Sequence, residues 1–191
     1  METLKALVNE GKIRYVGLSE CTAQELRRAH AVHPVTAIQM EWSLQTRDIE
    51  ESLVPVAREL GVSIVAYSPL GRGFLADLAA LDSLPANDAR KTFFPRFTGE
   101  LFEENKRRIA KFYDLAARKG CTPAQLALAW VHSKGDDVIP IPGTKSAKRI
   151  EENARTLSLL PLSVEEIAEI EGAVSVVGDR YADMSTTFNQ R

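Results

Sequence analysis

The chain has 191 residues, of which 45% are hydrophobic and 26% are charged, as is usual for a globular protein. Its formal net charge of −2 gives no overall field that favours nucleic acid or an anionic membrane, and its longest apolar runs are far too short to span a bilayer. We therefore expect no nucleic-acid partner and no membrane partner.

The first part of the sequence alternates between predicted helices and short apolar strands. Apolar spacing, capping residues and glycines mark where each element begins and ends. In chain order we expect a helix over Glu2–Glu10, a strand over Ile13–Leu18, a helix from the capping box at Thr22–Glu25 to Val32, a strand over Ala37–Glu41, a helix over Asp48–Leu60 and a strand over Val62–Tyr67.

The second part begins with a long stretch, Gly71–Gly99, that is rich in Gly, Pro and Asp and is expected to be irregular. It is too long for a simple connection, which suggests a functional lid. The elements expected after it are helices over Leu101–Lys119 and Thr122–Ser133, a strand over Val138–Ile141, a helix that contains Arg149, a last helix capped by Ser163–Glu166, and a tail over 174–191 that is loose beyond Gly178.

The order of these elements predicts the fold class. Short, buried-looking strands that alternate with helices are typical of a parallel sheet covered by helices, so we expect an α/β fold. No internal boundary is apparent, and residues 1–191 are expected to form a single domain.

Two features bear on the cellular compartment. The N-terminal stretch METLKALVNEG is charged and amphipathic and lacks the apolar core of a signal peptide. Cys21 and Cys121 stand apart without metal-binding spacing, as expected of ordinary small side chains in a reducing setting. We expect a cytoplasmic protein without a metal site.

Polar residues follow all four predicted strands. Parallel α/β folds place their sites at the carboxyl edge of the sheet, so these residues are expected to converge there. They are Ser19 and Glu20 after the first strand, Gln39, Glu41 and Ser43 at the second, Tyr67 and Ser68 at the third, and Gly143, Thr144, Lys145 and Ser146 after the fourth.

The most informative of these ends is IPIPGTKSAKRIEEN, residues 139–153. Gly143 lets the backbone approach a ligand, and Ser146 can cap a helix whose N-terminus offers free N–H donors. Lys145 and Arg149 add full positive charges at the end of the helix where cations oppose the dipole. The pattern indicates an anion site, most naturally for phosphate, although a solvated basic helix start would look similar.

Two further strand ends suggest contacts to an aromatic ligand. Tyr67 in AYSPLGRGFL offers a ring for stacking, and the turn after it offers backbone N–H groups for a pyrophosphate. The Gln39 amide can pair with a carboxamide. Each residue also has a plainer interpretation. Tyr67 could be a core tyrosine followed by an ordinary turn, and Gln39 could be a polar residue that faces a loop. There is no G-x-G-x-x-G, which argues against a Rossmann-type site.

Taken together, the segments GKIRYVGLSE, IQMEWSL, VAYSPLGRGFL, CTPAQLALAW and VIPIPGTKSAKRIEEN closely resemble the aldo-keto reductases, best the plant and microbial branch described as auxin-induced or perakine-reductase-like. The resemblance covers residues 2–172 in the family's order. It implies a (β/α)8 barrel of the TIM-barrel type that binds NADPH and reduces small aldehydes or ketones.

The resemblance also assigns roles to the strand ends. Ser19 and Gln39 would hold the nicotinamide carboxamide, and Tyr67 would stack on the nicotinamide ring. The remaining implied contacts are Ser68, Pro69, Leu70, Gly71 and Arg72 for the ribose and pyrophosphate, Gly143, Thr144, Lys145, Ser146 and Arg149 for the adenosine 2′-phosphate, and Glu152 and Asn153 for the adenine. Glu20 departs from the Asn of the better-known animal branch.

The four strands resemble the fifth to eighth strands of the barrel, whereas the family's catalytic Asp, Tyr, Lys and His lie on the first four. We therefore expect the second half of a barrel, with no catalytic residue in this chain and with an uncovered sheet face and two open edges. Such a half is expected to dock on a complementary half or on itself. The alternatives are an inactive NADPH-binding or interaction module, or a truncated fragment.

Overall fold

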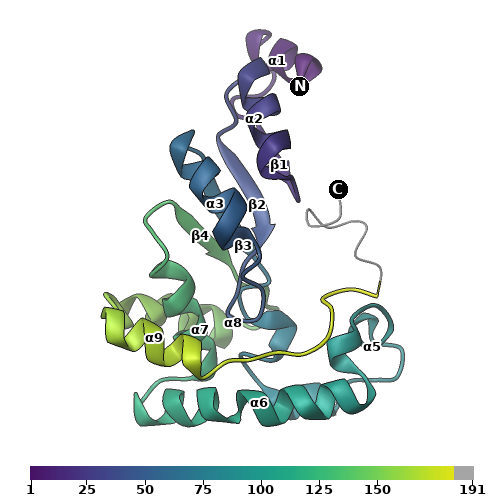
Figure 1. The fold of residues 1–191 in the computed structure, drawn as a ribbon, viewed down its shortest axis with the longest axis vertical. Helices are drawn as coiled ribbons and strands as arrows, with labels where there is room; N and C mark the ends of the chain where they lie inside the picture. Colours follow the sequence, from purple (N-terminus) through teal and green to yellow (C-terminus); the bar gives the residue numbers. More distant parts are fainter. Residues whose placement is uncertain (183–191) are drawn as a thin grey trace.

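Four short strands form one parallel sheet at the centre of the structure, a computed structural model that describes residues 1–182 (Figure 1). The strands are β1 (Gly17–Ser19), β2 (Ala37–Glu41), β3 (Ser63–Tyr67) and β4 (Val138–Ile141), and they lie in the order β1-β2-β3-β4. Each neighbouring pair is parallel, so helical crossovers must connect the strands. The predicted α/β class with a parallel sheet is confirmed.

Nine α-helices occur in the part of the chain that the structure describes, together with three 3₁₀ turns. The helices are α1 (Glu2–Asn9), α2 (Ala23–Val32), α3 (Ile49–Glu59), α4 (Leu78–Asp82), α5 (Ala89–Phe93), α6 (Gly99–Arg118), α7 (Pro123–His132), α8 (Ala147–Ala154) and α9 (Val164–Gly172), and the 3₁₀ turns are η1 (Gly71–Gly73), η2 (Pro95–Phe97) and η3 (Arg155–Leu159). Figure 1 shows α1 at one end of the molecule and α6 along the other. Among residues 1–182, no helix is long and apolar enough to cross a membrane.

The capping boxes predicted at three helix starts are confirmed. Thr22, Thr122 and Ser163 each accept a hydrogen bond from the backbone N–H three residues later, at 3.1–3.2 Å. The acidic or amide side chain at that later position returns the bond to the backbone N–H of the cap. Each box therefore satisfies N–H groups that the first turn of a helix would otherwise leave free.

The first predicted strand is wrong in its extent. The sequence predicts a strand over Ile13–Leu18, but β1 begins only at Gly17, and Tyr15 is 74% exposed. The ladder begins where Gly17 pairs with Ala37, because β2 starts there after the break at His33-Pro34. Val16 still accepts a backbone hydrogen bond from Thr36 at 2.8 Å, but residues 13–15 have no strand partner in the part of the chain that the structure describes.

The expectation of an irregular segment over Gly71–Gly99 is also wrong. This segment contains α4 and α5 as well as two 3₁₀ turns. Asp77 accepts a hydrogen bond from the Ala80 N–H at 3.0 Å, and Asp88 accepts one from the Arg90 N–H at 2.9 Å. The two aspartates, which were predicted to lie in a loop, are therefore the N-caps of two short helices.

The tail is more ordered than predicted, as far as the structure describes it. Arg180 and Tyr181 lie in the stretch expected to be loose, yet Arg180 is only 2% exposed and Tyr181 hydrogen-bonds to three side chains. Residues 183–191 of the predicted tail lie outside the described residues.

One face of the sheet is packed by helices. The strand register places Ile38, Ile64 and Val138 in one row and Met40 and Ala66 in the next, and all five are buried. Helices α2, α3 and α7 contribute buried side chains to the same core. Removal of this apolar surface from water is the main stabilising contribution to the fold.

The opposite face of the sheet is open. Its rows carry Ser19 and Gln39, which are exposed, and Ile139 and Ile141, which are 46% and 42% exposed. Tyr67 lies in the same row as Ile141 and is half-buried. Strands β1 and β4 are the outer strands of the sheet.

Glu171 connects α9 to the rest of the fold. Its carboxylate accepts a hydrogen bond from the Trp130 indole N–H at 2.9 Å and forms ion pairs with Lys134 at 2.6 Å and Arg47 at 2.8 Å. Partial burial on its own would raise the pKa of Glu171, but the hydrogen bonds from its three partners outweigh it and lower the pKa. The carboxylate is therefore held in its charged form in the folded state.

We expect Glu171→Gln to lower the free energy of unfolding by about 1–2 kcal/mol at neutral pH, because charge-assisted hydrogen bonds are lost. Since the folded-state pKa is depressed, the contribution of Glu171 is present above its unfolded pKa and is lost as the pH falls through the folded pKa. Urea denaturation across that pH range should show the difference vanishing in acid. Glu169→Gln is the control, because Glu169 is on the same helix and, among residues 1–182, forms an ion pair only with the exposed Arg118. An equal effect of both variants would contradict this role for Glu171.

Candidate functional site

A cavity of about 720 Å³ lies at the carboxyl ends of β3 and β4, and we call it the β3–β4 cavity. The walls come from the ends of β3 and β4 and the segments after them, from the starts of α4, α5 and α7, and from one side of α8. The lining residues are Tyr67, Ser68, Pro69, Leu70, Arg72, Gly73, Ala76, Asp77, Arg90, Thr122, Pro123, Ala124, Ile141, Pro142, Gly143, Thr144, Arg149, Glu152 and Asn153. Small-molecule and cofactor sites usually measure roughly 300–1,000 Å³, so this cavity has a suitable size.

Most of the site residues predicted from the sequence line this cavity. They are Tyr67, Ser68, Pro69, Leu70, Arg72, Gly143, Thr144, Arg149, Glu152 and Asn153. The structure thus brings residues of two distant segments, 67–72 and 143–153, to the wall of one cavity. The pairing of Tyr67 with Ile141 between β3 and β4 places these segments together.

Five predicted residues do not line the cavity. Ser19 and Gln39 are paired in register on the open sheet face, and both are exposed. Gly71 is buried, Lys145 is exposed, and Ser146 is half-buried at the start of α8.

Gly71 packs closely against Gln45 and does not face the cavity. It has φ +54, and a Cβ atom there would lie 2.4 Å from Gln45 Oε1, which is far inside van der Waals contact. Only glycine meets both conditions. Gly71 therefore does not line the cavity, and its contact with the ribose or pyrophosphate stays a prediction.

The wall after β4 carries positive charge at a helix start. Ser146 caps α8 by accepting from the Arg149 N–H at 3.5 Å, and the Thr144 hydroxyl accepts from the Ser146 N–H at 3.1 Å. The Arg149 guanidinium lies 3.5 Å from the Asp77 carboxylate on the facing wall. This exposed pair is weak, so an anion with more charge than one carboxylate can compete for Arg149.

Glu152 is already bonded to the neighbouring helix. Its carboxylate accepts a hydrogen bond from the Thr122 hydroxyl at 2.7 Å, and its carbonyl accepts from the Gln125 side chain at 3.1 Å. These bonds fix the cavity wall formed by α8 against the start of α7. Asn153, the next residue, lines the same wall.

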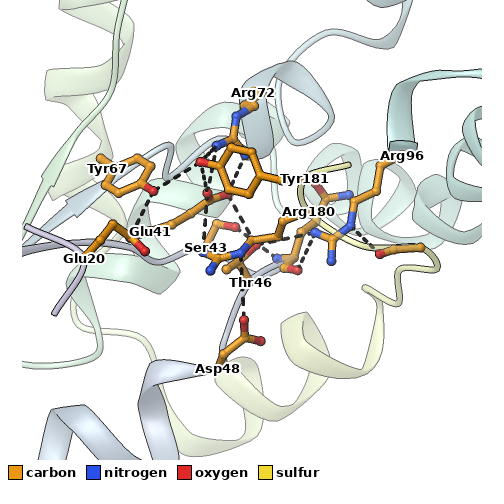
Figure 2. Close-up of polar contacts among 12 residues, drawn as sticks. Glu20, Glu41, Ser43, Thr46, Asp48, Tyr67, Arg72, Arg96, Arg180 and Tyr181 are labelled. Atoms are coloured by element: carbon orange, nitrogen blue, oxygen red, sulfur yellow. Dashed lines mark hydrogen bonds and ion pairs between the residues drawn. The ribbon is translucent and has the colours of Figure 1, made fainter. Parts of the chain in front are cut away.

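Tyr67 and Arg72 direct their polar ends into a cluster beside the cavity (Figure 2). The Tyr67 hydroxyl donates to Glu20 at 2.8 Å, and the Arg72 guanidinium donates to both oxygens of Glu41, at 2.7 and 2.8 Å. Burial, the hydrogen bond with Tyr181 and the charge of Glu41 raise the pKa of the Tyr67 phenol far above its usual value. Tyr67 is therefore a neutral hydrogen-bond donor and a poor acid.

The same sheet edge carries unusual backbone. Among residues 1–182, three residues other than glycine have positive φ: Glu20 at 48°, Ser68 at 50° and Arg72 at 53°. All three follow the carboxyl end of β1 or β3. Such conformations are unfavourable for side-chain-bearing residues and concentrate at functional sites, where the surroundings hold them in place.

Sequence reasoning missed part of the cavity wall and the part of the cluster that comes from the C-terminal segment, Arg180 and Tyr181. Asp77, Arg90 and Thr122 line the wall, but Asp77 and Arg90 lay in a stretch expected to be irregular. The Thr122 cap was recognised, and the start of a helix is a usual place for a site, so that signal was present. Nothing in the sequence placed Tyr181 beside Glu41.

Three further aromatic side chains do not line the cavity. Trp42 and Phe97 are buried in the core, and Phe93 is 58% exposed outside the cavity. Within residues 1–182, no group of three or more His, Cys, Asp or Glu side chains is arranged to hold a metal ion.

Comparison with known proteins gives consistent matches. The model of the Aldo/keto reductase family matches residues 1–175. A thermostable aldo-keto reductase solved with the inhibitor epalrestat is similar at 26% identity and a TM-score of 0.65, over 90% of this chain and 53% of that one. A glycerol dehydrogenase from Gluconobacter oxydans is similar at 26% identity and a TM-score of 0.80, over 89% of this chain and 51% of that one. The chain thus spans about half the length of both structures.

Proposed function

Because the chain belongs to the aldo/keto reductase family, we propose that it supplies the NADPH-binding half of an oxidoreductase that reduces aldehydes or ketones. The bound coenzyme would supply the hydride that is transferred to the carbonyl carbon. The observation that carries the proposal is that Tyr67 and Arg149 line one cavity of suitable size. We further propose that the protein is most similar to the plant and microbial branch of the family, described as auxin-induced or perakine-reductase-like. Its cytoplasmic location stays a prediction.

The groups in the wall suit a dinucleotide phosphate. Tyr67 offers an aromatic ring, the turn at 68–70 offers backbone N–H groups, and Arg149 lies at the start of α8 with its positive end of the helix dipole. In this proposal Tyr67 stacks on the nicotinamide, Ser19 and Gln39 hold its carboxamide from the open sheet face, and Lys145 joins Arg149 at the 2′-phosphate. Glu152 and Asn153 contact the adenine.

A second function, coenzyme binding without turnover, is favoured by the state of Tyr67. Among the described residues, Tyr67 is the one tyrosine that lines the cavity; its hydroxyl donates to Glu20, and the pKa of its phenol is raised. A group in that state is a poor proton donor to a carbonyl oxygen, since general acids work best with a pKa near the working pH. Turnover by this chain alone is therefore expected to be slight.

The open sheet face supports a proposal about partners. Ile139 and Ile141 expose apolar surface there, and both outer strands carry unpaired edges among the described residues. A complementary half-barrel of four strands would cover this face and pair both edges. Self-association is the alternative. Size-exclusion chromatography with light scattering measures either assembly, and circular dichroism separates a cooperatively melting domain from an unfolded fragment.

The proposed function is tested by adding NADPH to the purified protein and following nicotinamide fluorescence, and then by adding an aromatic aldehyde and following the nicotinamide absorbance. We expect saturable binding and little oxidation. Oxidation well above the buffer rate would show that the chain contains its own proton donor. A cooperatively folded sample that does not bind NADPH would contradict the proposal.

A further inference from the structure

Two residues of the cavity wall are hydrogen-bonded to carboxylates that lie outside the cavity. Tyr67 and Arg72 both line the β3–β4 cavity, yet the Tyr67 hydroxyl donates to Glu20 and the Arg72 guanidinium is bidentate on Glu41. Glu41 is 1% exposed and so cannot exchange this partner for water. The positions of both wall residues are therefore determined outside the cavity.

Tyr181 connects the Tyr67–Glu20 hydrogen bond to the Arg72–Glu41 ion pair (Figure 2). Its hydroxyl accepts a hydrogen bond from Arg72 Nη2 at 2.6 Å and lies 3.4 Å from both the Tyr67 hydroxyl and Glu41 Oε2. The Tyr67 proton is already donated to Glu20, so the Tyr181 proton is the one available for these two acceptors. The Tyr181 hydroxyl thus touches the polar ends of both wall residues.

The ring of Tyr181 adds a second kind of contact. It packs on the Phe94 ring with centroids 5.1 Å apart. The Arg72 guanidinium lies 4.2 Å from the Phe94 centroid and 5.0 Å from the Tyr181 centroid, within the range of cation–π attraction. Arg72, whose φ is positive, is therefore held by two rings, a carboxylate and a phenol.

Arg180 anchors Tyr181 in the chain. Its side chain is 2% exposed, with the guanidinium 3.5 Å from Glu41 and 3.9 Å from Asp48. Its three guanidinium nitrogens are buried without a hydrogen-bond partner among the described residues, so attraction to these two carboxylates is what offsets the cost of burying the charge. The neighbouring residue, Tyr181, is held near Glu41 with it.

We propose that Tyr181 is a positioning residue that holds Tyr67 and Arg72 in the shape that receives the coenzyme. The inference rests on the proposed NADPH site. It adds that the C-terminal segment 174–182 holds two residues of that site in place. Tyr181 does not line the cavity and acts only through the two residues that do. A site whose side chains are fixed in advance loses less conformational freedom when a ligand binds, so the phenol is expected to increase affinity.

The test compares Tyr181→Phe with Tyr113→Phe. Both changes remove a half-buried phenol that hydrogen-bonds, but Tyr113 donates to the Phe74 carbonyl at 3.0 Å and does not line the cavity. Tyr181→Phe keeps the ring contacts with Phe94 and Arg72. We expect it to weaken NADPH binding about 2- to 10-fold in a fluorescence titration, the range given by one lost hydrogen bond. Tyr113→Phe is expected to bind as the unmodified protein does, whatever its melting temperature.

Equal affinities for Tyr181→Phe and the unmodified protein would overturn the inference, as would equal losses in both variants. A failure of the unmodified protein to bind would overturn the proposed function instead. Crystal structures of the unliganded protein and of Tyr181→Phe provide a readout that needs no coenzyme. We expect the Arg72 guanidinium or the Tyr67 ring to be displaced in the variant, and unchanged positions of both would contradict the positioning role.

Discussion

Replacing Glu41 with glutamine is expected to lower the free energy of unfolding by about 3–5 kcal/mol, because the change removes one partner of a buried ion pair. Glu41 is 1% exposed and receives two hydrogen bonds from Arg72, and the buried Arg180 lies 3.5 Å away. Without the carboxylate, two guanidinium groups remain in an environment with little water. Small domains are stable by only about 5–15 kcal/mol, so the variant should be near its unfolding limit. Urea denaturation followed by circular dichroism measures the difference.

Glu59→Gln is the matched control for this prediction. Glu59 also forms a two-bond pair with an arginine, Arg27, but both side chains are exposed. Exposed pairs contribute little because water replaces the partner, so the denaturation midpoint should hardly change. If both variants lost the same stability, burial would not be what makes the Glu41 cluster important.

Replacing both Lys145 and Arg149 with alanine is expected to weaken NADPH binding about 10²- to 10⁴-fold and to change NADH binding little. Each charge-assisted hydrogen bond to the 2′-phosphate contributes roughly 1.5–3 kcal/mol, and NADH lacks that phosphate. Arg149 lines the cavity, and Lys145 lies in the exposed segment that leads to the cap of α8. Fluorescence titration with each coenzyme at one fixed salt concentration gives the two ratios.

The double variant Lys148→Ala, Arg155→Ala controls for the change of two charges. Lys148 is on α8 and Arg155 is its C-cap, and neither side chain lines the cavity. This control should reduce binding of both coenzymes only slightly, through the general field, and added salt should remove that effect. Equal losses of NADPH and NADH in the Lys145, Arg149 variant would contradict the 2′-phosphate assignment.

Local sequence signals predicted the elements that frame the site. Short apolar runs marked β2, β3 and β4 to within a residue or two, and the capping boxes at Thr22, Thr122 and Ser163 marked helix starts. Apolar runs and capping boxes depend on residues close in sequence, so these elements can be predicted without knowledge of tertiary contacts. Because strands in a parallel sheet end at one edge, the meeting of Tyr67 with the segment after β4 also followed from the sequence.

Contacts between distant residues account for what the sequence could not predict. Tyr181 meets Tyr67 and Arg72 across more than 100 positions of the chain, and no local pattern encodes that distance. The buried position of Arg180 is unexpected for a charged residue near the end of a chain, since arginine is rarely fully buried without a partner. The extent of β1 depended likewise on where β2 begins rather than on its own residues.

A crystal structure of the protein grown with saturating NADP⁺ tests the central claim most directly. We predict that the nicotinamide lies beside Tyr67 and that the 2′-phosphate lies within hydrogen-bond distance of Arg149 at the start of α8. Coenzyme bound in the reverse direction, bound away from the β3–β4 cavity, or missing from a well-ordered cavity would contradict it.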